Sequence, residues 1–398
     1  MINLKKTFED ALEFVNNKVC FVRCDLNLPF TDGKITDFTR LDKTVPTIKE
    51  ILLRKGKIIL ISHFGRPNGK FNETLSLKPL VPFLEKRIGK IIKFCDEDIK
   101  NSEKLKKKIN KLESGGVMLL ENIRFYKEEE ENDLNFSKNL SSLGDIFINE
   151  SFSSSHRSHS SITGISTFLP SFPGKLFQYE LQNLNHVVKE MQKQNSIAVL
   201  GGSKISTKMK VIENLSKKFN KILIGGAMAN TFLASQGINI GKSFSEFRML
   251  EKTNIIYKQN KDKIILPIDC IVSKSENDEM SSAVDVGNIK GDDLIFDIGP
   301  KTRKIFYNEI LKHEKLLWNG PLGLFEKKPF DNGTNYVSSI VNKHKSDRFF
   351  SIAGGGDTIS ALKNSGNINN FSFISTGGGA FLEFIEGKSL PGIEILNN

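Results

Sequence analysis

Basic and polar side chains follow a series of short apolar runs in the first half of the sequence. Arg23, Asp25 and Asn27 alternate after the first run, so they project from one face of a strand. The other candidates, which follow later runs or open a helix, are Arg40, His63, Arg66, Arg124 and Arg157. Guanidinium groups bind phosphate and carboxylate through paired hydrogen bonds. One such arginine alone could be a surface ion pair, but several at equivalent positions predict a site for a small polyanion.

Glycines take the place of arginines after the apolar runs of the second half. The run 349–353 leads into Gly354-Gly355-Gly356 and then Asp357-Thr358, and a second glycine triplet follows the run 371–376. Glycine lets the backbone approach a ligand, and the free N–H groups of a helix start attract anions. Two tight turns without a ligand are the alternative. The repetition of the pattern favours a phosphate cradle, with Asp357 available for a metal.

Three more glycine loops occur in the second half, one of them rich in lysine. They are Gly201 to Lys208, Gly225-Gly226, and Asn319 to Glu326. A glycine-walled pocket that also holds lysines is suited to a nucleotide. The Gly-x-Gly-x-x-Gly motif of dinucleotide dehydrogenases does not follow a strand here. The segment Gly237–Ser243 is one residue short of a Walker loop and follows a helix, so we set it aside.

Apolar runs alternate with helical patterns in both halves, which predicts an α/β fold with mostly parallel sheets. Ligands of such sheets bind beyond the carboxyl ends of the strands, where the candidate residues lie. A chain of 398 residues favours two domains. A helical pattern from Leu176 to Met191, free of glycine, predicts a long helix that joins two Rossmann-like domains separated by a cleft.

Composition limits the classes of function. The formal net charge of +11 allows an RNA-binding protein, but lysines spread along the whole chain supply 47 of the 57 basic residues. We therefore expect no nucleic-acid partner. No apolar run is long enough for a membrane span, and the first twelve residues do not resemble a signal peptide. We expect a cytoplasmic protein whose four cysteines are reduced and buried.

Three local patterns have competing interpretations. His156 and His159 have the spacing of half a metal site, but they lack an acidic or cysteine partner at ligand spacing, so we predict no zinc. Glu128 to Glu131 is predicted to be a solvated acidic turn. Cys20 and Cys24 lie on one face of a strand, which favours core packing over redox chemistry.

The sequence resembles the phosphoglycerate kinase family from end to end, through at least seven motifs in the family's order. They are Arg23-Cys24-Asp25-Leu26-Asn27-Leu28-Pro29, Ser62-His63-Phe64-Gly65-Arg66-Pro67, Leu120-Glu121-Asn122-Ile123-Arg124-Phe125, His156-Arg157-Ser158-His159-Ser160, Gly201 to Lys208, Trp318 to Glu326, and Gly354 to Thr358 with Gly377 to Ala380. The ordered set is far more specific than any single motif.

The resemblance implies a domain for 3-phosphoglycerate or 1,3-bisphosphoglycerate over 1–172, an interdomain helix over 173–194, and a nucleotide domain over 195–384. Residues 385–398 would return to the first domain. The implied substrate-binding residues are Asp25, Leu26, Asn27, Arg40, His63, Phe64, Gly65, Arg66, Arg124 and Arg157. The implied residues for Mg-ADP or Mg-ATP are Gly201, Lys204, Lys208, Gly225, Asn319, Glu326, Gly354, Gly355, Gly356, Asp357 and Thr358. Asp357 would also serve Mg²⁺, and Glu326 the ribose.

The implied activity is reversible phosphoryl transfer between 1,3-bisphosphoglycerate and ADP by a monomeric glycolytic enzyme. Phosphoryl transfer requires alignment and neutralisation of charge, which we assign to Arg40 and Lys208 as catalytic residues. Because donor and acceptor would bind different domains, hinge-type closure would complete the site. Another ATP-dependent carboxylate kinase is the nearer alternative, and a basic RNA-binding protein the more distant one.

The chain departs from the family's pattern at two places. The family usually has Asn-Asp-Ala-Phe-Gly where this chain has Asn149-Glu150-Ser151-Phe152-Ser153. It also usually has Ser-Asp-Lys at Ser206-Thr207-Lys208. The expected arginines and lysines remain, so these departures bear on rate or hinge behaviour rather than on the reaction.

Overall fold

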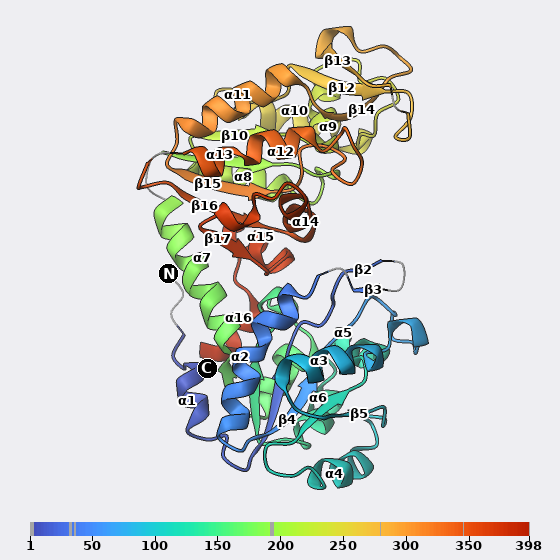
Figure 1. The fold of residues 1–398 in the computed structure, drawn as a ribbon, viewed down its shortest axis with the longest axis vertical. Helices are drawn as coiled ribbons and strands as arrows, with labels where there is room; N and C mark the ends of the chain where they lie inside the picture. Colours follow the sequence, from blue (N-terminus) through green and yellow to red (C-terminus); the bar gives the residue numbers. More distant parts are fainter. Residues whose placement is uncertain are drawn as a thin grey trace. The chain divides into compact units, whose positions relative to one another are not determined.

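The computed structural model describes residues 4–31, 34–35, 37–191, 195–278, 280–344 and 346–397. They form two compact units, coloured along the chain in Figure 1. The N-terminal unit contains the described residues up to Gln182 together with Lys388 onward, and the C-terminal unit runs from Asn183 to Gly387. The division falls within one helix, α7 (Lys175–Met191). This helix confirms the long helical pattern predicted from Leu176 to Met191.

The N-terminal unit is built on a six-stranded parallel sheet in the order β5-β6-β4-β1-β7-β8. Its strands are β1 (Val19–Arg23), β4 (Lys57–Ile61), β5 (Ile92–Cys95), β6 (Val117–Leu120), β7 (Ile146–Asn149) and β8 (Ser171–Pro173). A short antiparallel pair, β2 (Phe30–Thr31) and β3 (Lys34–Ile35), lies outside this sheet. The helices are α1 (Phe8–Leu12), α2 (Thr39–Leu53), α3 (Val81–Ile88), α4 (Ser102–Asn110), α5 (Lys127–Glu131), α6 (Leu134–Ser141) and α16 (Pro391–Glu394).

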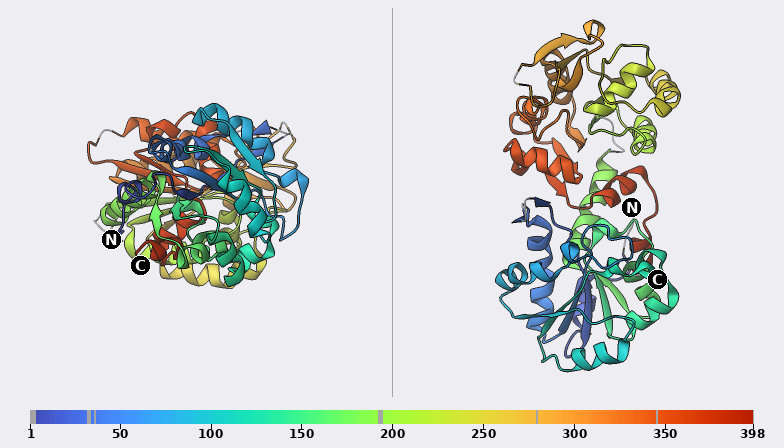
Figure 2. Two further views of the ribbon diagram at one scale, coloured as in Figure 1. Left: turned by 90° about the horizontal axis from the view of Figure 1, so that it is seen from below. Right: turned by 90° about the vertical axis from the view of Figure 1, so that its right-hand side faces the viewer.

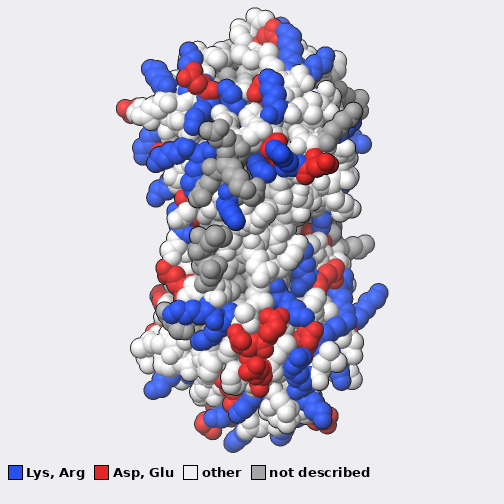
Figure 3. All heavy atoms as spheres, turned by 90° about the vertical axis from the view of Figure 1, so that its left-hand side faces the viewer, with Lys and Arg blue, Asp and Glu red and all other residues white. Residues whose placement is uncertain are grey.

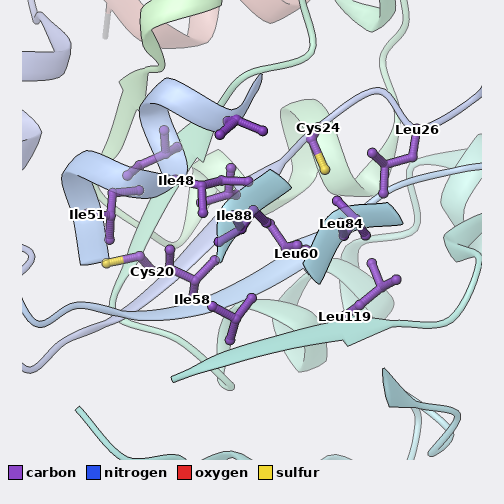
Figure 4. Close-up of a cluster of buried hydrophobic side chains, with 14 of the residues drawn as sticks. Cys20, Cys24, Leu26, Ile48, Ile51, Ile58, Leu60, Leu84, Ile88 and Leu119 are labelled. Atoms are coloured by element: carbon purple, nitrogen blue, oxygen red, sulfur yellow. The ribbon is translucent and has the colours of Figure 1, made fainter. Parts of the chain in front are cut away.

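Helices cover both faces of this sheet, which explains why its strands are almost continuously apolar (Figure 2). Successive strand residues face opposite sides, so Val22 packs with α1, α2 and α3 while Phe21 packs with α4 and α6. Cys20 and Cys24 lie among aliphatic side chains of the first of these clusters (Figure 4). All four cysteines are free and buried, as predicted.

The C-terminal unit contains a second six-stranded parallel sheet, in the order β11-β10-β9-β15-β16-β17. Its strands are β9 (Ser196–Leu200), β10 (Lys221–Ile224), β11 (Ile264–Ile265), β15 (Lys315–Asn319), β16 (Phe350–Gly354) and β17 (Phe373–Ser375). A three-stranded antiparallel sheet accompanies it, formed by β12 (Asp269–Ser273), β13 (Ser282–Asp285) and β14 (Leu294–Ile298). The helices are α8 (Met209–Lys218), α9 (Ala227–Ser235), α10 (Leu250–Gln259), α11 (Pro300–Leu311), α12 (Asn332–Ser338), α13 (Ile340–Lys343), α14 (Gly356–Asn364) and α15 (Gly379–Glu386).

The predicted α/β class with mostly parallel sheets is therefore confirmed. Near the end of the chain, the Gly392 N–H donates a 2.8 Å hydrogen bond to the Ser155 carbonyl within the N-terminal unit.

On the face drawn in Figure 3, lysines and arginines are interspersed with acidic and neutral side chains. None of the helices in the described ranges has the length and apolar character needed to cross a membrane.

The prediction for Glu128–Glu131 is wrong in part. These residues belong to the short helix α5, and Glu129 turns inward and is fully buried while Glu130 and Glu131 are exposed. Ser161 satisfies the buried carboxylate, since its hydroxyl and its N–H donate hydrogen bonds of 2.6 and 2.8 Å to the two Glu129 oxygens. One member of the acidic run is thus part of the interior.

Candidate active site

The carboxyl ends of β1, β4 and β7 lie in register at one edge of the N-terminal sheet, where Arg23 pairs with Ile61 and with Asn149. Hydrogen bonds tie the loops that follow. The Leu26 N–H donates to Ser62 Oγ over 2.8 Å, and the Gly65 N–H donates to Asn27 Oδ1 over 3.0 Å. This sheet edge therefore carries a set of residues that we call the arginine cluster: Asp25, Asn27, Arg40, His63, Arg66, Arg124 and Arg157.

Asp25 is the acidic centre of the arginine cluster. Its Oδ2 lies 3.1 Å from Arg40 Nη1 and also accepts the Ser153 hydroxyl, while its Oδ1 accepts the Asn27 N–H over 3.0 Å. Burial alone would raise the pKa of Asp25, but the charge of Arg40 and these hydrogen bonds outweigh it and hold the pKa below its ordinary value. Asp25 is therefore ionised at neutral pH and holds Arg40, which also donates to the Asn27 carbonyl.

The other basic members differ in exposure. Arg124 is half-buried and donates a 3.0 Å hydrogen bond to the Gly65 carbonyl, and burial lowers its pKa. Arg66, whose charge acts on Arg124, and Arg157 are exposed. His63 is 6% exposed, and burial followed by the charge of Arg23 lowers its pKa well below the ordinary value. The cluster therefore carries its positive charge on arginines.

Two of the predicted substrate-binding residues do not present their side chains to a ligand. Leu26 and Phe64 are buried members of the hydrophobic cluster on the α2 side of the sheet. Only their backbone could contribute to binding. Five residues that are not in the implied substrate-binding set adjoin the cluster: Arg23, Glu129, Ser153, His159 and Ser161. The alternation of Arg23 with Asp25 was a signal for the first of them.

The glycine loops of the C-terminal unit enclose a cavity of about 240 Å³, which we call the glycine cavity. It is lined by Gly202, Ser203, Lys204, Thr207, Lys208, Asn319, Gly320, Pro321, Gly355, Gly356, Asp357 and Thr358. A larger cavity of about 570 Å³ shares Gly202, Ser203, Pro321 and Asp357 with it and extends to Glu326. The carboxyl ends of β9, β15 and β16 supply most of these loops, as expected for a parallel sheet.

Lys208 supplies a half-buried cation to the glycine cavity. Its Nζ donates to the Gly201 carbonyl over 2.6 Å and to the Asn319 carbonyl over 3.3 Å. Burial lowers the pKa of Lys208 to about 8, and the charge of Asp357 opposes that shift. Lys208 therefore remains largely protonated at neutral pH but is easily perturbed.

Asp357 lies in the first turn of α14 and is exposed. The N-cap position is Gly355, so Asp357 is not the capping residue. Its carboxylate forms no hydrogen bond or ion pair with the described part of the chain. Asn319 Oδ1, which is buried and likewise lacks a partner among the described residues, belongs to the lining of the same cavity. Two oxygen acceptors thus remain available there.

Hydrogen bonds fix the walls of the glycine cavity. Asn319 Nδ2 donates to the Gly354 carbonyl over 2.6 Å, and the Gly320 N–H donates to Thr358 Oγ1 over 2.7 Å. Gly355 has φ of +105°, and a Cβ there would lie 2.7 Å from Asn319 Nδ2. Glycine at this position therefore satisfies both the backbone conformation and the close approach of two loops.

Three of the predicted glycines do not line either cavity. A Cβ on Gly201 would lie 2.0 Å from the Pro321 carbonyl oxygen. A Cβ on Gly225 would lie 2.4 Å from Leu322, and one on Gly354 would lie 2.6 Å from Phe381. Their following residues Gly202, Gly226 and Gly355 face the cavities instead. The segment Gly237–Ser243, which we set aside, ends with Lys242 and Ser243 in the lining of the larger cavity.

A glycine cavity with a half-buried lysine and an exposed carboxylate, on an α/β fold with a separate arginine cluster, defines a phosphotransferase of small molecules. The sequence profile of the family described as "Phosphoglycerate kinase" matches residues 10–388. The phosphoglycerate kinase of Orientia tsutsugamushi (strain Ikeda) is 44% identical over 392 residues, which cover 96% of this chain and 95% of that one. The chain belongs to the phosphoglycerate kinase family.

Further relatives agree with this assignment. The phosphoglycerate kinase of Finegoldia magna is 43% identical over 397 residues, or 99% of each chain. Among solved structures, that of phosphoglycerate kinase from Coxiella burnetii matches with a TM-score of 0.80 and 35% identity over 96% of each chain. That from Pyrococcus horikoshii OT3 matches with a TM-score of 0.85 and 28% identity, also over 96% of each chain. The activity is that of a phosphoglycerate kinase of glycolysis.

Proposed function

We propose that the arginine cluster binds 3-phosphoglycerate and the acyl phosphate 1,3-bisphosphoglycerate. The low pKa of Asp25 supports this, because an ionised carboxylate accepts a hydrogen bond from the substrate's hydroxyl group. Asn27 would help to hold the hydroxyl and carboxyl end. The exposed guanidinium groups of Arg66 and Arg157, with half-buried Arg124, would bind the phosphate through paired hydrogen bonds.

The two cavities of the C-terminal unit would bind ADP or ATP. The glycine cavity suits the phosphates, since Lys208 supplies a cation and the start of α14 supplies free N–H groups and the positive end of a helix dipole. The larger cavity suits the nucleoside, with Glu326 in its lining available for the ribose hydroxyls. Lys204 would contribute a second positive charge at the phosphate end.

The residues present also fit Mg²⁺. Asp357 offers an exposed carboxylate without a partner in the described chain, and Mg²⁺ that is bound to phosphates commonly takes one or two protein carboxylates, directly or through water. When bound, Mg²⁺ neutralises charge on phosphate oxygens. The buried acceptor Asn319 Oδ1 could receive a hydrogen bond from water at such a site.

In the forward reaction, ADP attacks the acyl phosphorus of 1,3-bisphosphoglycerate. A bond forms between phosphorus and an oxygen of the ADP β-phosphate, and the bond between phosphorus and the carboxyl oxygen breaks. The carboxylate of 3-phosphoglycerate leaves with the electron pair. Arg40, held by Asp25, and Lys208 would neutralise charge on the transferred group from the acceptor and the nucleotide side respectively. The transfer requires the ligands of the two units to come together by closure.

The observation that carries this proposal is the division of the binding groups, with the arginines in one unit and the glycine cavity in the other. Amide NMR spectra of the full chain test it. Titration with 3-phosphoglycerate should shift resonances of the arginine cluster, and titration with Mg-ADP should shift those of the glycine cavity. If both ligands shifted only the C-terminal unit, the assignment of the arginine cluster would be wrong.

We also propose that the protein acts as a monomer in the cytoplasm. Its four cysteines are free and buried, which is suited to a reducing compartment. Size-exclusion chromatography with light scattering measures the mass directly. A mass of twice 44.7 kDa would contradict the monomer.

A further inference from the structure

We infer that Arg23 holds His63 as a neutral imidazole with its hydrogen on Nε2, and that Ser161 and Glu129 position Arg23 for this task. His63 would then recognise the substrate as a hydrogen-bond donor and not as a cation. The effect on substrate binding rests on the proposed role of the arginine cluster. The state of the ring does not, because it follows from contacts within the N-terminal unit.

The contact between Arg23 and His63 determines which ring nitrogen carries the hydrogen. Arg23 Nη2 lies 3.1 Å from His63 Nδ1, and the two residues are 1% and 6% exposed. A guanidinium group only donates hydrogen bonds and is not deprotonated in proteins. Nδ1 must therefore accept, which requires a lone pair on that nitrogen. The remaining hydrogen of a neutral imidazole then lies on Nε2.

The same reasoning identifies the donor and the acceptor in the hydrogen bonds that join Arg23 to Ser161 and Ser161 to Glu129. Arg23 Nε donates to Ser161 Oγ over 2.9 Å, and Nη1 donates to the Cys24 carbonyl. The Ser161 hydroxyl accepts from Arg23, so its own hydrogen is free for Glu129 Oε1, 2.6 Å away. The Ser161 N–H donates to Glu129 Oε2. These four residues form one chain of buried hydrogen bonds, in which Arg23 donates to His63 at one end and to Ser161 at the other, and Ser161 donates to Glu129. We call this chain the Glu129 relay.

The charged groups around His63 also favour the neutral imidazole. Arg23 and Asp25 adjoin it from β1 and the loop that follows, Arg40 from α2, and Arg124 from the loop after β6. Three guanidinium groups and one carboxylate would surround a fourth positive charge in a buried place. Burial and the charge of Arg23 lower the pKa of His63, and Asp25 opposes this only in part.

This arrangement separates two tasks within the arginine cluster. The arginines supply the charge that attracts a phosphate or carboxylate. His63 supplies one directional donor, Nε2–H, whose state should not change over the range from about pH 8 to about pH 5 in which an ordinary histidine becomes charged. The hydrogen bond that His63 offers to an anion is thereby made independent of pH in that range.

Nitrogen-15 NMR of the histidine side chains in the full chain tests the ring state. We expect His63 to show an unprotonated Nδ1 and a protonated Nε2 with no titration between about pH 8 and about pH 5. A His63→Gln variant identifies its resonances among those of the six histidines. Titration of the ring near its ordinary pKa, or hydrogen on Nδ1, would overturn the inference. This measurement needs only the wild-type fold.

The variant Ser161→Ala tests the relay, and Ser160→Ala is its matched control. Ser160 is equally buried and adjacent, but its hydroxyl donates to the Glu128 carbonyl and takes no part in the relay. In Ser161→Ala we expect hydrogen to appear on His63 Nδ1 in part of the molecules. The KM for 3-phosphoglycerate should rise about fivefold, the effect of one hydrogen bond, with the KM for Mg-ATP unchanged.

The outcomes separate the inference from the proposed function. An unchanged His63 spectrum in Ser161→Ala, or an equal change in Ser160→Ala, would overturn the role of the relay. If the ring has the inferred state and 3-phosphoglycerate leaves its resonances unmoved, the inference holds and the proposed substrate site fails.

Discussion

Thr47 donates a 2.5 Å hydrogen bond from its hydroxyl to Glu150 Oε1, which links the middle of α2 to the carboxyl end of β7. The same carboxylate accepts the Leu176 and Phe177 N–H groups in the first turn of α7, over 3.1 and 3.4 Å. Glu150 stands where the family usually has aspartate. Its longer side chain fills the space beside Gly174, where a Cβ would lie 1.8 Å from Glu150 Oε2. Glu150 thus links α2, β7 and α7.

Glu150 should make the stability of the protein depend on pH. Burial raises its pKa from 4.5 to about 8, although the hydrogen bond from Thr47 opposes this shift. Between these values the folded protein holds a proton that the unfolded chain has released, so the contribution to the free energy of unfolding falls as pH rises. The loss approaches about 1.4 kcal/mol per pH unit until about pH 8 and then stops.

Chemical denaturation of the wild type and of Glu150→Gln checks this. The variant lacks the titrating group and loses well-formed hydrogen bonds, so we expect it to be less stable than the wild type near pH 5 by about 1–3 kcal/mol. Its deficit should shrink as pH rises and change sign before about pH 8, because only the wild type loses about 1.4 kcal/mol per pH unit over this range. A deficit that grows with pH would show that the folded state prefers the ionised carboxylate.

The sequence could predict the features that rest on periodicity and on the rule for parallel sheets. Strands such as 57–61 and 117–120 are short apolar runs because both faces of the sheet are covered, and the residues after them must meet at one edge. Leu176 to Met191 forms a helix because its apolar residues recur at helical spacing without a glycine.

Features that depend on contacts distant in the sequence could not be predicted. Four adjacent glutamates indicate a solvated turn, and only the opposing Ser161 shows why Glu129 is buried. Gly201 and Gly202 have the same local pattern, yet the Pro321 backbone approaches the first while the second faces the cavity. Ser243 reaches the larger cavity because its hydroxyl accepts the Ile295 N–H of β14, which no local pattern reveals.

Lys208→Ala should abolish most turnover and leave the fold intact. The ammonium group lies at the glycine cavity, bound to two backbone carbonyls, so its charge should act on the transferred phosphate. We expect kcat to fall by about 10²- to 10³-fold, as for the loss of one oxyanion donor. Lys210→Ala is the control, because Lys210 is exposed and lies outside the lining of both cavities. Near-normal kcat in Lys208→Ala would remove Lys208 from the reaction.

The lowered pKa of Lys208 predicts that kcat/KM for the nucleotide falls at high pH. Burial brings its pKa to about 8, so the side chain loses its charge as pH rises through that value. The ratio kcat/KM for the nucleotide reports ionisations of the free enzyme and should decline above about pH 8. Replacement by arginine, which keeps its charge, should shift the decline to higher pH even if the maximum is lower. An identical profile in Lys208→Arg would assign the decline to another group.

Asp357→Asn should raise the Mg²⁺ concentration needed for half-maximal activity and lower kcat. The carboxylate is exposed, lines the glycine cavity and is not the N-cap of α14, so its loss should cost only about 0.3–1 kcal/mol of stability through the helix dipole. Activity against Mg²⁺ at saturating nucleotide, beside a thermal melt, checks both expectations. Glu213→Gln removes another exposed charge, on α8 outside both cavities, and controls for net charge. Unchanged Mg²⁺ dependence in Asp357→Asn would exclude the metal role.

Substitution by alanine should lower the stability of the protein at Gly355 but not at the adjacent Gly356, although both lie at the start of α14. Gly355 has φ of +105° and a Cβ there would lie 2.7 Å from Asn319 Nδ2, so Gly355→Ala should lower stability by about 1–3 kcal/mol. Gly356 is the first residue of the helix, and a Cβ there would meet no atom of the described chain within 4 Å. Gly356→Ala should therefore melt at or slightly above the wild-type temperature, because alanine favours the helix.

The methyl group that Gly356→Ala introduces would, however, enter the glycine cavity, where the proposed phosphates approach the backbone. Calorimetric titration with Mg-ADP should then show binding that is several-fold weaker in Gly356→Ala despite its intact fold, whereas binding of 3-phosphoglycerate should not change. The combination distinguishes a ligand cradle from a tight turn. If Gly356→Ala binds Mg-ADP as the wild type does, the free space above Gly356 is not the phosphate site, and the glycines of this loop serve only the chain's own geometry.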